Sequence, residues 1–303
     1  MMNDNKGQNS TNINWYPGHM VKTKRQILED LKLVDIVLEL LDARIPVSSQ
    51  NPDIKEIVGS KKKIVVLNKC DLAEEKENQK WVKDFENKGI KAVLTDSNSG
   101  VGVQELIRAI REMAKEEVSK SIQKGRIGKS VRMMILGIPN VGKSSLINRM
   151  AKKTSAGVGN KPGFTKQKQW IRVSNEIELL DTPGILWPKF ESETVGLHLS
   201  VTGTIKDEIL EKTQMAFYLV KWFIQNKEER LLERYKITKE ELETITKTIE
   251  NPNAQVAEII TRIAKKRGAI LSGGYIDEER VAGIIIDDFR TGKMGRITIE
   301  TVK

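Results

Sequence analysis

The sequence predicts an α/β fold in which a mostly parallel sheet, covered by helices in a three-layer arrangement, precedes an all-α domain. Two patterns support this prediction. From Val34 onward, short apolar runs alternate with helix-like segments, an order typical of parallel sheets whose strands are joined by helices. After Trp187 and Pro188 the strand-like runs stop and only helical periodicity remains.

The predicted strands are short apolar runs bounded by polar or turn-forming residues. They span 35–41, 63–67, 91–95, 131–136, 169–173 and 177–180. Helical patterns lie between them at 78–87, 103–118 and 143–152, and the basic segment 119–129 is a predicted connector. The helical patterns of the second part cover 194–202, 206–235, 239–250, 254–266 and 278–290.

The chain therefore divides into a disordered tail (1–14), a sheet domain (15–188) and a helical domain (189–303). Two helix ends in the last part have local signals. Thr238 and Glu241 have the spacing of a capping box. Gly268 follows three cations, as expected for a C-cap at the negative end of a helix dipole.

Composition favours a globular protein of the cytoplasm with no membrane partner. Hydrophobic residues make up 39% of the 303 residues. No run approaches the ~18 apolar residues of a membrane span. Residues 1–14 are polar and lack the apolar segment of a secretory signal. Cys70 is the one cysteine, which excludes an internal disulfide and favours a reducing compartment.

Positive charge is concentrated in the first part of the chain. Residues 1–189 contain 33 Lys and Arg against 22 Asp and Glu, a net +11. The remainder contains 18 against 19, a net −1. Cations that neutralise phosphates release counterions, so nucleic acid is the favoured partner of this basic part. A basic face that is merely solvated is the alternative.

The strongest motif is GIPNVGKSS (137–145), which follows an apolar strand and opens a helix. This context is the one that a phosphate-binding loop requires, because glycines let the backbone wrap the phosphates at a helix N-terminus. Lys143 is expected to reach the β- and γ-phosphates, and the Ser144 hydroxyl to bind Mg²⁺. The predicted nucleotide-binding residues of this loop are Asn140, Val141, Gly142, Lys143, Ser144 and Ser145.

DTPG (181–184) ends another apolar strand, some forty residues past the phosphate-binding loop. An acid at this place fits the Mg²⁺ side of a nucleotidase, so Asp181 is expected to hold the ion, through water, and the Gly184 N–H to meet the γ-phosphate. Thr165, in the flexible loop between the two motifs, is predicted to complete the Mg²⁺ coordination. Thr154 is the alternative, but it lies close to the loop's own helix.

NKCD (68–71) follows the strand KKIVVL and selects the base. The Asp71 carboxylate can accept two hydrogen bonds from the ring N–H and the amine of guanine, a pair that adenine lacks. Asn68 is expected to brace the loops and the Lys69 stem to cover the base. Cys70 completes this predicted base-binding loop. The motif therefore favours GTP and GDP over ATP.

The segment Thr95-Asp96-Ser97 ends a strand where a second base-contacting loop belongs. The backbone of Asp96 and Ser97 is predicted to contact guanine O6, and an ordinary strand-ending turn is the alternative. Together these motifs predict a P-loop GTPase domain in circularly permuted order, because NKCD precedes the phosphate-binding loop. DTPG then leads directly into the helical domain, so its rearrangement by the γ-phosphate is expected to move that domain.

The residue after DTPG is Ile185 rather than the Gln that orients water in Ras-like proteins. Intrinsic hydrolysis is therefore expected to be slow, on the order of 10⁻⁴ s⁻¹, with acceleration by a partner. Asn140 can offer its carbonyl to a monovalent cation such as K⁺ beside the phosphates. His19, in WYPGHM (15–20), is a candidate catalytic residue, with capping or packing as its alternative. His198 is predicted to be structural.

With these residues, the chain resembles the ribosome-biogenesis GTPase A (YlqF-type) family of circularly permuted GTPases. The similarity covers nearly the whole chain from Trp15. It rests on WYPGHM, LLDARIP (40–46), NKCD, GIPNVGKSS, KPGFTK (161–166), DTPG and IDDFRTGKMGRITIE (286–300). Tyr16 stands where many relatives have Phe.

The resemblance implies a cytoplasmic GTPase that binds the large (50S) ribosomal subunit, its rRNA and proteins rather than DNA, late in assembly. It also implies hydrolysis stimulated by the subunit, assistance by K⁺ at Asn140, catalysis by His19 and RNA contact by the helical domain. That domain is not basic overall, so its contact would depend on a local patch such as 265–267. We expect a monomer. An rRNA-binding scaffold with little turnover is the alternative, whereas no lipidation motif supports a trafficking GTPase.

Overall fold

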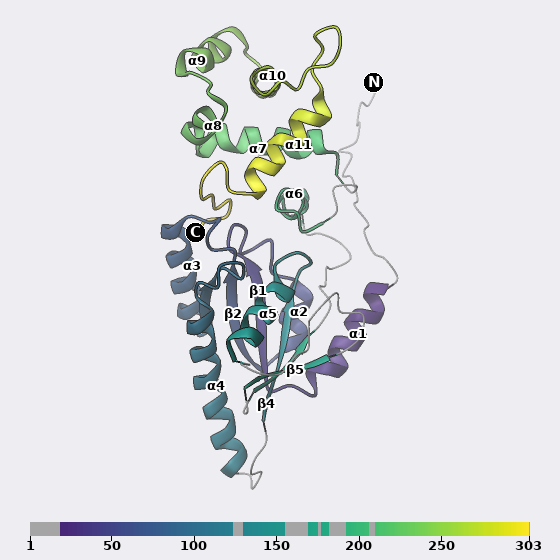
Figure 1. Ribbon diagram of the computed structural model, residues 1–303, viewed down its shortest axis with the longest axis vertical. Coiled ribbons are helices and arrows are strands. Elements are labelled where there is room, and N and C mark those ends of the chain that lie inside the picture. Colours follow the sequence, from purple (N-terminus) through teal and green to yellow (C-terminus); the bar gives the residue numbers. More distant parts are fainter. Residues whose placement is uncertain are drawn as a thin grey trace, which may run out of the picture.

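A six-stranded sheet forms the first domain of the computed structural model (Figure 1), which describes residues 19–123, 130–154, 169–174, 177–181, 192–205 and 210–302. The strands are β1 (Ile36–Asp42), β2 (Lys62–Asn68), β3 (Lys91–Thr95), β4 (Val131–Gly137), β5 (Gln169–Ser174) and β6 (Ile177–Asp181). Their order is β3-β2-β1-β4-β6-β5, and β5 alone is antiparallel to its neighbour. The predicted mostly parallel sheet is confirmed.

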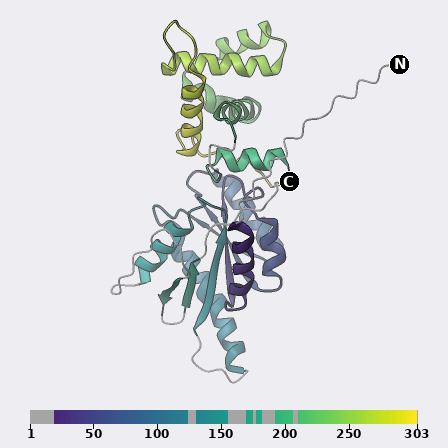
Figure 2. The same cartoon turned by 90° about the vertical axis from the view of Figure 1, so that its right-hand side faces the viewer.

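Helices cover both faces of this sheet, which gives three layers (Figure 2). The apolar side chains of β1 alternate between two cores: Ile36 and Leu38 face one, Val37 faces the other. The first core includes α4 (Val103–Gln123) and α5 (Lys143–Thr154). The second face is covered by α1 (His19–Leu31), α2 (Pro52–Val58) and α3 (Glu75–Asn87).

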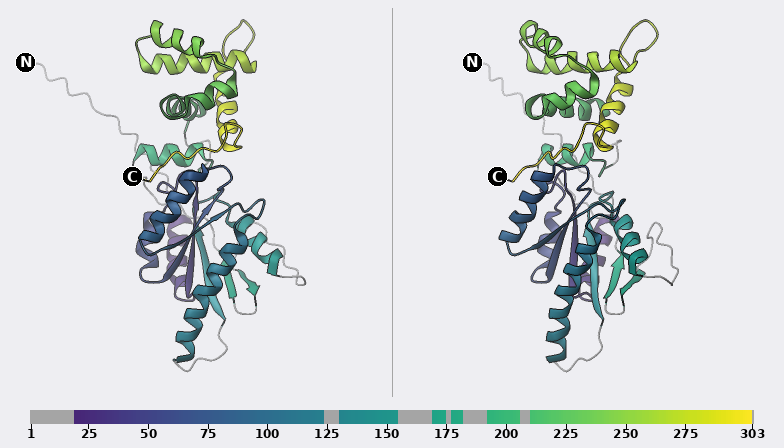
Figure 3. Two further views of the ribbon diagram at one scale, coloured as in Figure 1. Left: turned by 90° about the vertical axis from the view of Figure 1, so that its left-hand side faces the viewer. Right: turned by 60° about the vertical axis from the view of Figure 1, so that its left-hand side comes forward.

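The second part of the chain is helical within its described residues and lies beyond the carboxyl ends of the strands (Figures 1 and 3). It contains α6 (Glu193–Val201), α7 (Lys212–Asn226), α8 (Glu228–Tyr235), α9 (Lys239–Thr248), α10 (Pro252–Arg267) and α11 (Glu278–Arg290). Helices α7 to α11 share one apolar core, whereas Leu199 of α6 packs into the core of the sheet domain. Among the described helices, none combines the length and apolarity that crossing a bilayer requires.

The C-terminal segment returns from α11 to the sheet domain. The backbone N–H of Ile297 donates to the Leu72 carbonyl at 2.8 Å, and that of Ile299 donates to the Arg44 carbonyl at 2.9 Å. The Trp81 indole donates to the Glu300 carbonyl at 2.9 Å. This segment, 296–302, therefore straps the two parts of the chain together beside the NKCD loop.

Most predicted elements are present, and three differ. The predicted helix 206–235 is wrong as a single element, because α7 begins at Lys212 and Lys227 leaves the helical conformation between α7 and α8 (φ −149°, ψ 49°). The apolar pattern of the sequence continues across this break and therefore gave no sign of it. At the break, the Lys227 ammonium pairs with Glu74 of the sheet domain at 2.8 Å. Helix α4 continues to Gln123, into the predicted connector, and the short α2 was not predicted.

The local signals at two helix ends are confirmed. The Thr238 hydroxyl accepts from the Glu241 N–H, and the Glu241 carboxylate accepts from the Thr238 N–H, which completes the capping box. Gly268 ends α10 in the left-handed conformation, φ 67°. The division at 188/189 stays a prediction, since α6 packs partly with the sheet domain and residues 182–191 lie outside the described ranges.

Candidate nucleotide-binding site

The loop between β4 and α5 has the backbone of a phosphate-binding loop. Gly137 approaches β1 so closely that a Cβ there would lie 2.7 Å from the Leu40 carbonyl oxygen. Asn140 and Gly142 have positive φ angles of 55° and 102°. The loop therefore turns sharply into the N-terminus of α5, where free backbone N–H groups favour an anion.

Lys143 lies at the first position of α5 and is 8% exposed. Its ammonium donates to the carbonyl oxygens of Gly137 at 3.0 Å and Ile138 at 2.8 Å. Ser144 and Ser145 follow it and are exposed. The ammonium is thus held within the loop by weakly basic carbonyls, which a phosphate can replace.

Asn68 joins three loops at the carboxyl edge of the sheet. Its side chain is buried, and the amide donates to the Val141 carbonyl at 2.7 Å. Its oxygen accepts from the Thr95 hydroxyl at 3.0 Å and from the Ser97 hydroxyl at 2.7 Å and N–H at 3.1 Å. The NKCD loop, the TDS loop and the phosphate-binding loop therefore meet, as their positions after parallel strands predict.

Asp71 and Asp96 lie near one another beside these loops. Burial, and next the charge of Asp96, raise the pKa of Asp71 above its ordinary 3.8. Burial also raises the pKa of the Cys70 thiol to about 11, so the thiol stays protonated at neutral pH. An Asp71 carboxylate that is costly to ionise alone gains from the paired N–H donors of a base.

The TDS loop is a tight turn whose donors are already engaged. The Asp96 N–H donates to the Val101 carbonyl at 3.1 Å, and the Ser97 N–H donates to the Asn68 oxygen. The Asp96 carboxylate caps the N–H groups of Asn98 and Ser99. The predicted contact with guanine O6 would therefore require one of the two N–H groups to be shared or released.

Comparison with known proteins matches this arrangement to a family. A family described as 50S ribosome-binding GTPase matches residues 132–263. Ribosome biogenesis GTPase A of Bacillus pumilus is 46% identical over 288 residues, which are 95% of this chain and 98% of the relative. The protein of the same name from Thermotoga maritima is 31% identical, over 95% of this chain and 94% of its own length. The chain belongs to the ribosome biogenesis GTPase A family.

Solved structures agree with the fold of this GTPase. GNP-bound YlqF from T. maritima superposes with a TM-score of 0.62 at 27% identity, covering 92% of this chain and 98% of that one. The GDP-bound form gives 0.63 at 26% identity, with coverages of 91% and 99%. The GTPase is therefore a GTP hydrolase that binds GTP and GDP and acts in ribosome biogenesis, as the motifs and the resemblance predicted.

Several predicted site residues have no described side chain. Thr165 and Gly184 lie outside the described residues. Asp181 ends β6, which pairs with β4 through Met134 and Leu180, so its backbone lies at the same sheet edge as the P-loop. His19 is the first residue of α1, and its side chain is not described. Their roles stay predictions.

The P-loop fits a hydrated Mg²⁺ ion. Mg²⁺ favours oxygen ligands and keeps several waters, so it needs few protein ligands beside the phosphates. Ser144 offers an exposed hydroxyl at the start of α5. In the part of the chain that the structure describes, no group of three or more His, Cys, Asp or Glu side chains could hold a metal.

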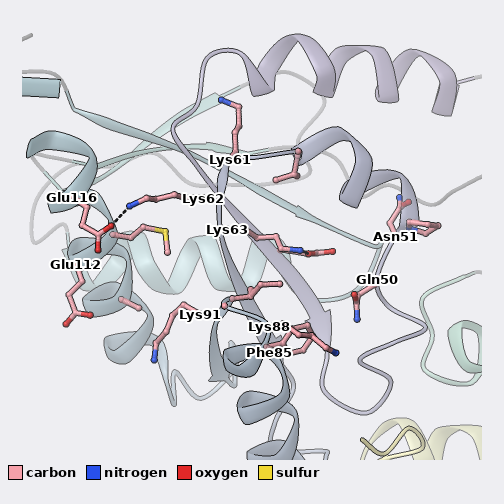
Figure 4. Close-up of a pocket in the computed structure, with 18 of the residues that line it drawn as sticks. Gln50, Asn51, Lys61, Lys62, Lys63, Phe85, Lys88, Lys91, Glu112 and Glu116 are labelled. Atoms are coloured by element: carbon pink, nitrogen blue, oxygen red, sulfur yellow. Dashed lines mark hydrogen bonds and ion pairs between the residues drawn. The ribbon is translucent and has the colours of Figure 1, made fainter. Parts of the chain in front are cut away.

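A lysine-lined groove of about 990 Å³ lies elsewhere on the GTPase (Figure 4). It is bordered by the start of β2, the end of α3 and the middle of α4. Three of its lysines pair with carboxylates: Lys63 with Glu39 at 2.6 Å, Lys62 with Glu116, and Lys91 with Glu86 at 3.0 Å. None of its lining residues belongs to the predicted nucleotide site, so we do not assign the nucleotide to it.

Two contacts of the site were not predicted from the sequence. The Asn140 side-chain amide donates to the Gly203 carbonyl at 2.9 Å, so the P-loop touches the end of α6 directly. Asp42 at the end of β1 pairs with Lys69 of the NKCD loop at 3.0 Å. Both contacts join residues that are distant in the sequence. The motif LLDARIP contains Asp42, but it did not predict the partner of this carboxylate.

His198 makes the structural contacts that its position predicted. Its Nδ1 lies 2.9 Å from the Ser48 hydroxyl and 2.8 Å from the Glu300 carboxylate. Its Nε2 lies 2.8 Å from the Tyr218 hydroxyl. The ring thus joins α6, α7, the loop after β1 and the C-terminal segment.

Proposed function

We propose that this GTPase binds the large (50S) ribosomal subunit late in its assembly and hydrolyses GTP to GDP and phosphate on contact with it. Membership of the family supports the partner, since the matching family is described as 50S ribosome-binding. The observation that supports coupling is the hydrogen bond from Asn140 of the P-loop to Gly203, at the foot of the helical domain. The protein acts as a monomer in the cytoplasm.

The proposed chemistry begins with the P-loop. Lys143 leaves the carbonyls of Gly137 and Ile138 and binds the β- and γ-phosphates. Ser144, Thr165 and Asp181 are the residues that would hold Mg²⁺, and the ion would supply positive charge that offsets the charge developing on the phosphates. The Gly184 N–H binds the γ-phosphate, while Asp71 binds the edge of guanine and Lys69 covers its face.

Stimulation by the subunit acts through the helical domain. When helices α6 through α11 bind rRNA and ribosomal proteins, the helical domain moves as a unit. This movement displaces Gly203, and thereby the Asn140 side chain. The Asn140 oxygen is then free for a K⁺ ion, which would supply positive charge beside the phosphates, or His19 assists the attacking water. The movement of DTPG predicted from the sequence would act on the same domain from the other side of the site.

The test is GTP turnover with and without purified large subunits, in potassium and in sodium buffers, for the wild type and His19→Ala. We expect turnover to rise by about 10²–10³ with subunits, the order of acceleration that one added charge-stabilising group gives. Dependence on potassium assigns the assistance to Asn140, whereas loss in His19→Ala assigns it to His19. Turnover that subunits leave unchanged would instead support an rRNA-binding scaffold.

A further inference from the structure

Asp42, the last residue of β1, is a fully buried carboxylate between two cations. The Arg44 guanidinium donates to both of its oxygens, at 2.9 and 2.8 Å, and the Lys69 ammonium lies 3.0 Å from one of them. The Arg44 N–H adds a bond of 3.1 Å. Burial alone would raise the pKa of Asp42, but Arg44 and Lys69 outweigh it and hold this pKa well below its usual range. The carboxylate is therefore ionised at every physiological pH.

Lys69, which forms the ion pair with Asp42, also has an uncommon backbone conformation. Its φ is 59°, in the left-handed region that few residues other than glycine adopt. The turn is closed by the N–H of Leu72, which donates to the Lys69 carbonyl at 3.0 Å, and the Asn68 carbonyl accepts from Ala43 at 2.9 Å. The loop of β1 and the NKCD loop are thus joined by backbone and side chain together.

We propose that Asp42 is a positioning residue for guanine binding, which holds the Lys69 side chain in place so that its stem covers the base. This inference rests on the proposed assignment of NKCD as the guanine-binding loop. A lysine stem has several rotatable bonds, and fixing it before the nucleotide arrives removes an entropy cost from binding. Asp42 does not touch the nucleotide and acts through Lys69.

Arg44 extends this arrangement to the helical domain. Its guanidinium donates to the Thr202 carbonyl at 3.4 Å and lies 5.4 Å from the centre of the Phe289 ring. Its backbone carbonyl accepts from Ile299. Residues of α6, α11 and the C-terminal segment therefore cover the charged group from water, which strengthens the attraction between its members.

A second buried pair, which joins the same strand β1 to β2, offers a matched control. Glu39 of β1 is 3% exposed and pairs with Lys63 of β2 at 2.6 Å, as Asp42 pairs with Lys69. Glu39 lies three residues from Asp42 and borders the lysine-lined groove, away from the three loops of the site. Glu39→Gln therefore removes a comparable charge from the same strand without touching the NKCD loop.

The experiment measures the affinity of the full-length protein for fluorescent GDP in Asp42→Asn, Lys69→Met, the double variant and Glu39→Gln. Lys69→Met keeps the apolar stem but removes its anchor, so each single variant should bind about fivefold more weakly, the loss typical of one ion pair. The double variant should bind no more weakly than the weaker single variant, because both remove the same interaction. Glu39→Gln should bind as the wild type does.

The proposal would be overturned if the losses of affinity in Asp42→Asn and Lys69→Met multiplied in the double variant. Wild-type affinity in either single variant would also overturn it. If Asp42→Asn does not fold, Lys69→Met against Lys69→Arg decides the question, since arginine keeps the charge and should restore most of the affinity. Asp71→Asn tests the assignment of the guanine-binding loop separately. This variant should shift the binding preference from GDP toward xanthosine diphosphate. Asp42→Asn and Lys69→Met should leave that preference unchanged. An unchanged preference in Asp71→Asn would reject the assignment itself.

Discussion

Gly142 faces Asn68 so closely that a Cβ on Gly142 would lie 2.3 Å from the Asn68 amide nitrogen. Asn68 in turn bonds to Val141 and Ser97. The P-loop glycine and the NKCD asparagine therefore fit together as one unit, in addition to the nucleotide contacts that are predicted for their loops. The distance explains why this P-loop position excludes every side chain.

Gly142→Ala should weaken GDP binding at least tenfold, because Asn68 must move and release the three loops that it joins. The variant also takes alanine to a φ of 102°, which costs about 1–3 kcal/mol. Nucleotide titration and urea unfolding measure the two effects. Gly89→Ala is the control, since Gly89 has φ 72° and nothing within 4 Å of its Cβ position. Equal affinity in the two variants would exclude an effect of the clash.

Lys143→Met should lower GTP turnover by about 10²–10³, the effect typical of removing one group that stabilises transition-state charge. The fold should persist, because methionine fills the same space and the two carbonyls that lose the ammonium lie at the last residue of β4 and in the loop that follows it. Turnover under saturating GTP and circular dichroism test the two statements. Lys115→Met, an exposed residue of α4, should behave as the wild type. Full turnover in Lys143→Met would remove Lys143 from the mechanism.

GDP affinity should depend on pH through Asp71. Guanine needs the ionised carboxylate, and the pKa of Asp71 is raised by burial and by Asp96, so affinity should begin to fall at a pH above the ordinary range around 3.8. Asp96→Asn removes the neighbouring charge and should move this fall to lower pH. Its single amide oxygen can still accept from the Asn98 N–H, whereas the bond from the Ser99 N–H to the second carboxylate oxygen is lost. Titrations of GDP between about pH 4 and 7 would reveal the shift, and coincident profiles would contradict it.

Glu300 should make the free energy of unfolding depend on pH, because its pKa is lower in the folded protein than its ordinary value. Burial raises its pKa, but hydrogen bonds from His198 and Ser48 outweigh burial and lower it below 4.5. The ionised carboxylate therefore stabilises the fold above the ordinary pKa, and this contribution is lost as pH falls through the lowered one.

Glu300→Gln should lower the free energy of unfolding by about 2 kcal/mol at neutral pH, the loss typical of hydrogen bonds to a charged group. The difference from the wild type should shrink as pH falls below 4.5. Urea unfolding across this range measures it. Glu75→Gln should change little, because Glu75 pairs with Arg296 at 3.4 Å where both are exposed. A constant difference at all pH values would show that the carboxylate charge is not responsible.

Asn140→Asp should loosen the junction between the P-loop and α6. The variant keeps an oxygen and tolerates the left-handed φ of 55°, but it places a carboxylate against the Gly203 carbonyl. Amide exchange near Gly203 should quicken about fivefold, as expected for one hydrogen bond. Asn226→Asp is the control, since Asn226 donates within α7 to Trp222 at 2.8 Å. Unchanged exchange near Gly203 would show that the contact does not hold the junction.

Much of the fold and of the site follows from local sequence. Each predicted strand matches an observed one. For the inner parallel strands the reason is that an apolar run bounded by turn residues indicates burial on both faces of the sheet. The meeting of NKCD, TDS and the P-loop could also be predicted, since each follows a parallel strand and such strands end at one edge. The break at Lys227 could not, because the apolar pattern continues through it while the pairing of Lys227 with Glu74 is long-range.

The GTPase chemistry of this protein can be inferred from its motifs alone, because the spacing of P-loop and NKCD residues predicts phosphate and guanine contacts within single loops. How those loops are supported becomes visible in the folded chain. Asp42 meets Lys69, Asn140 meets Gly203, and Glu300 meets Ser48 from the other end of the chain. Such pairs depend on where the strands and the helical domain lie in space. No periodicity or motif along the chain records that placement.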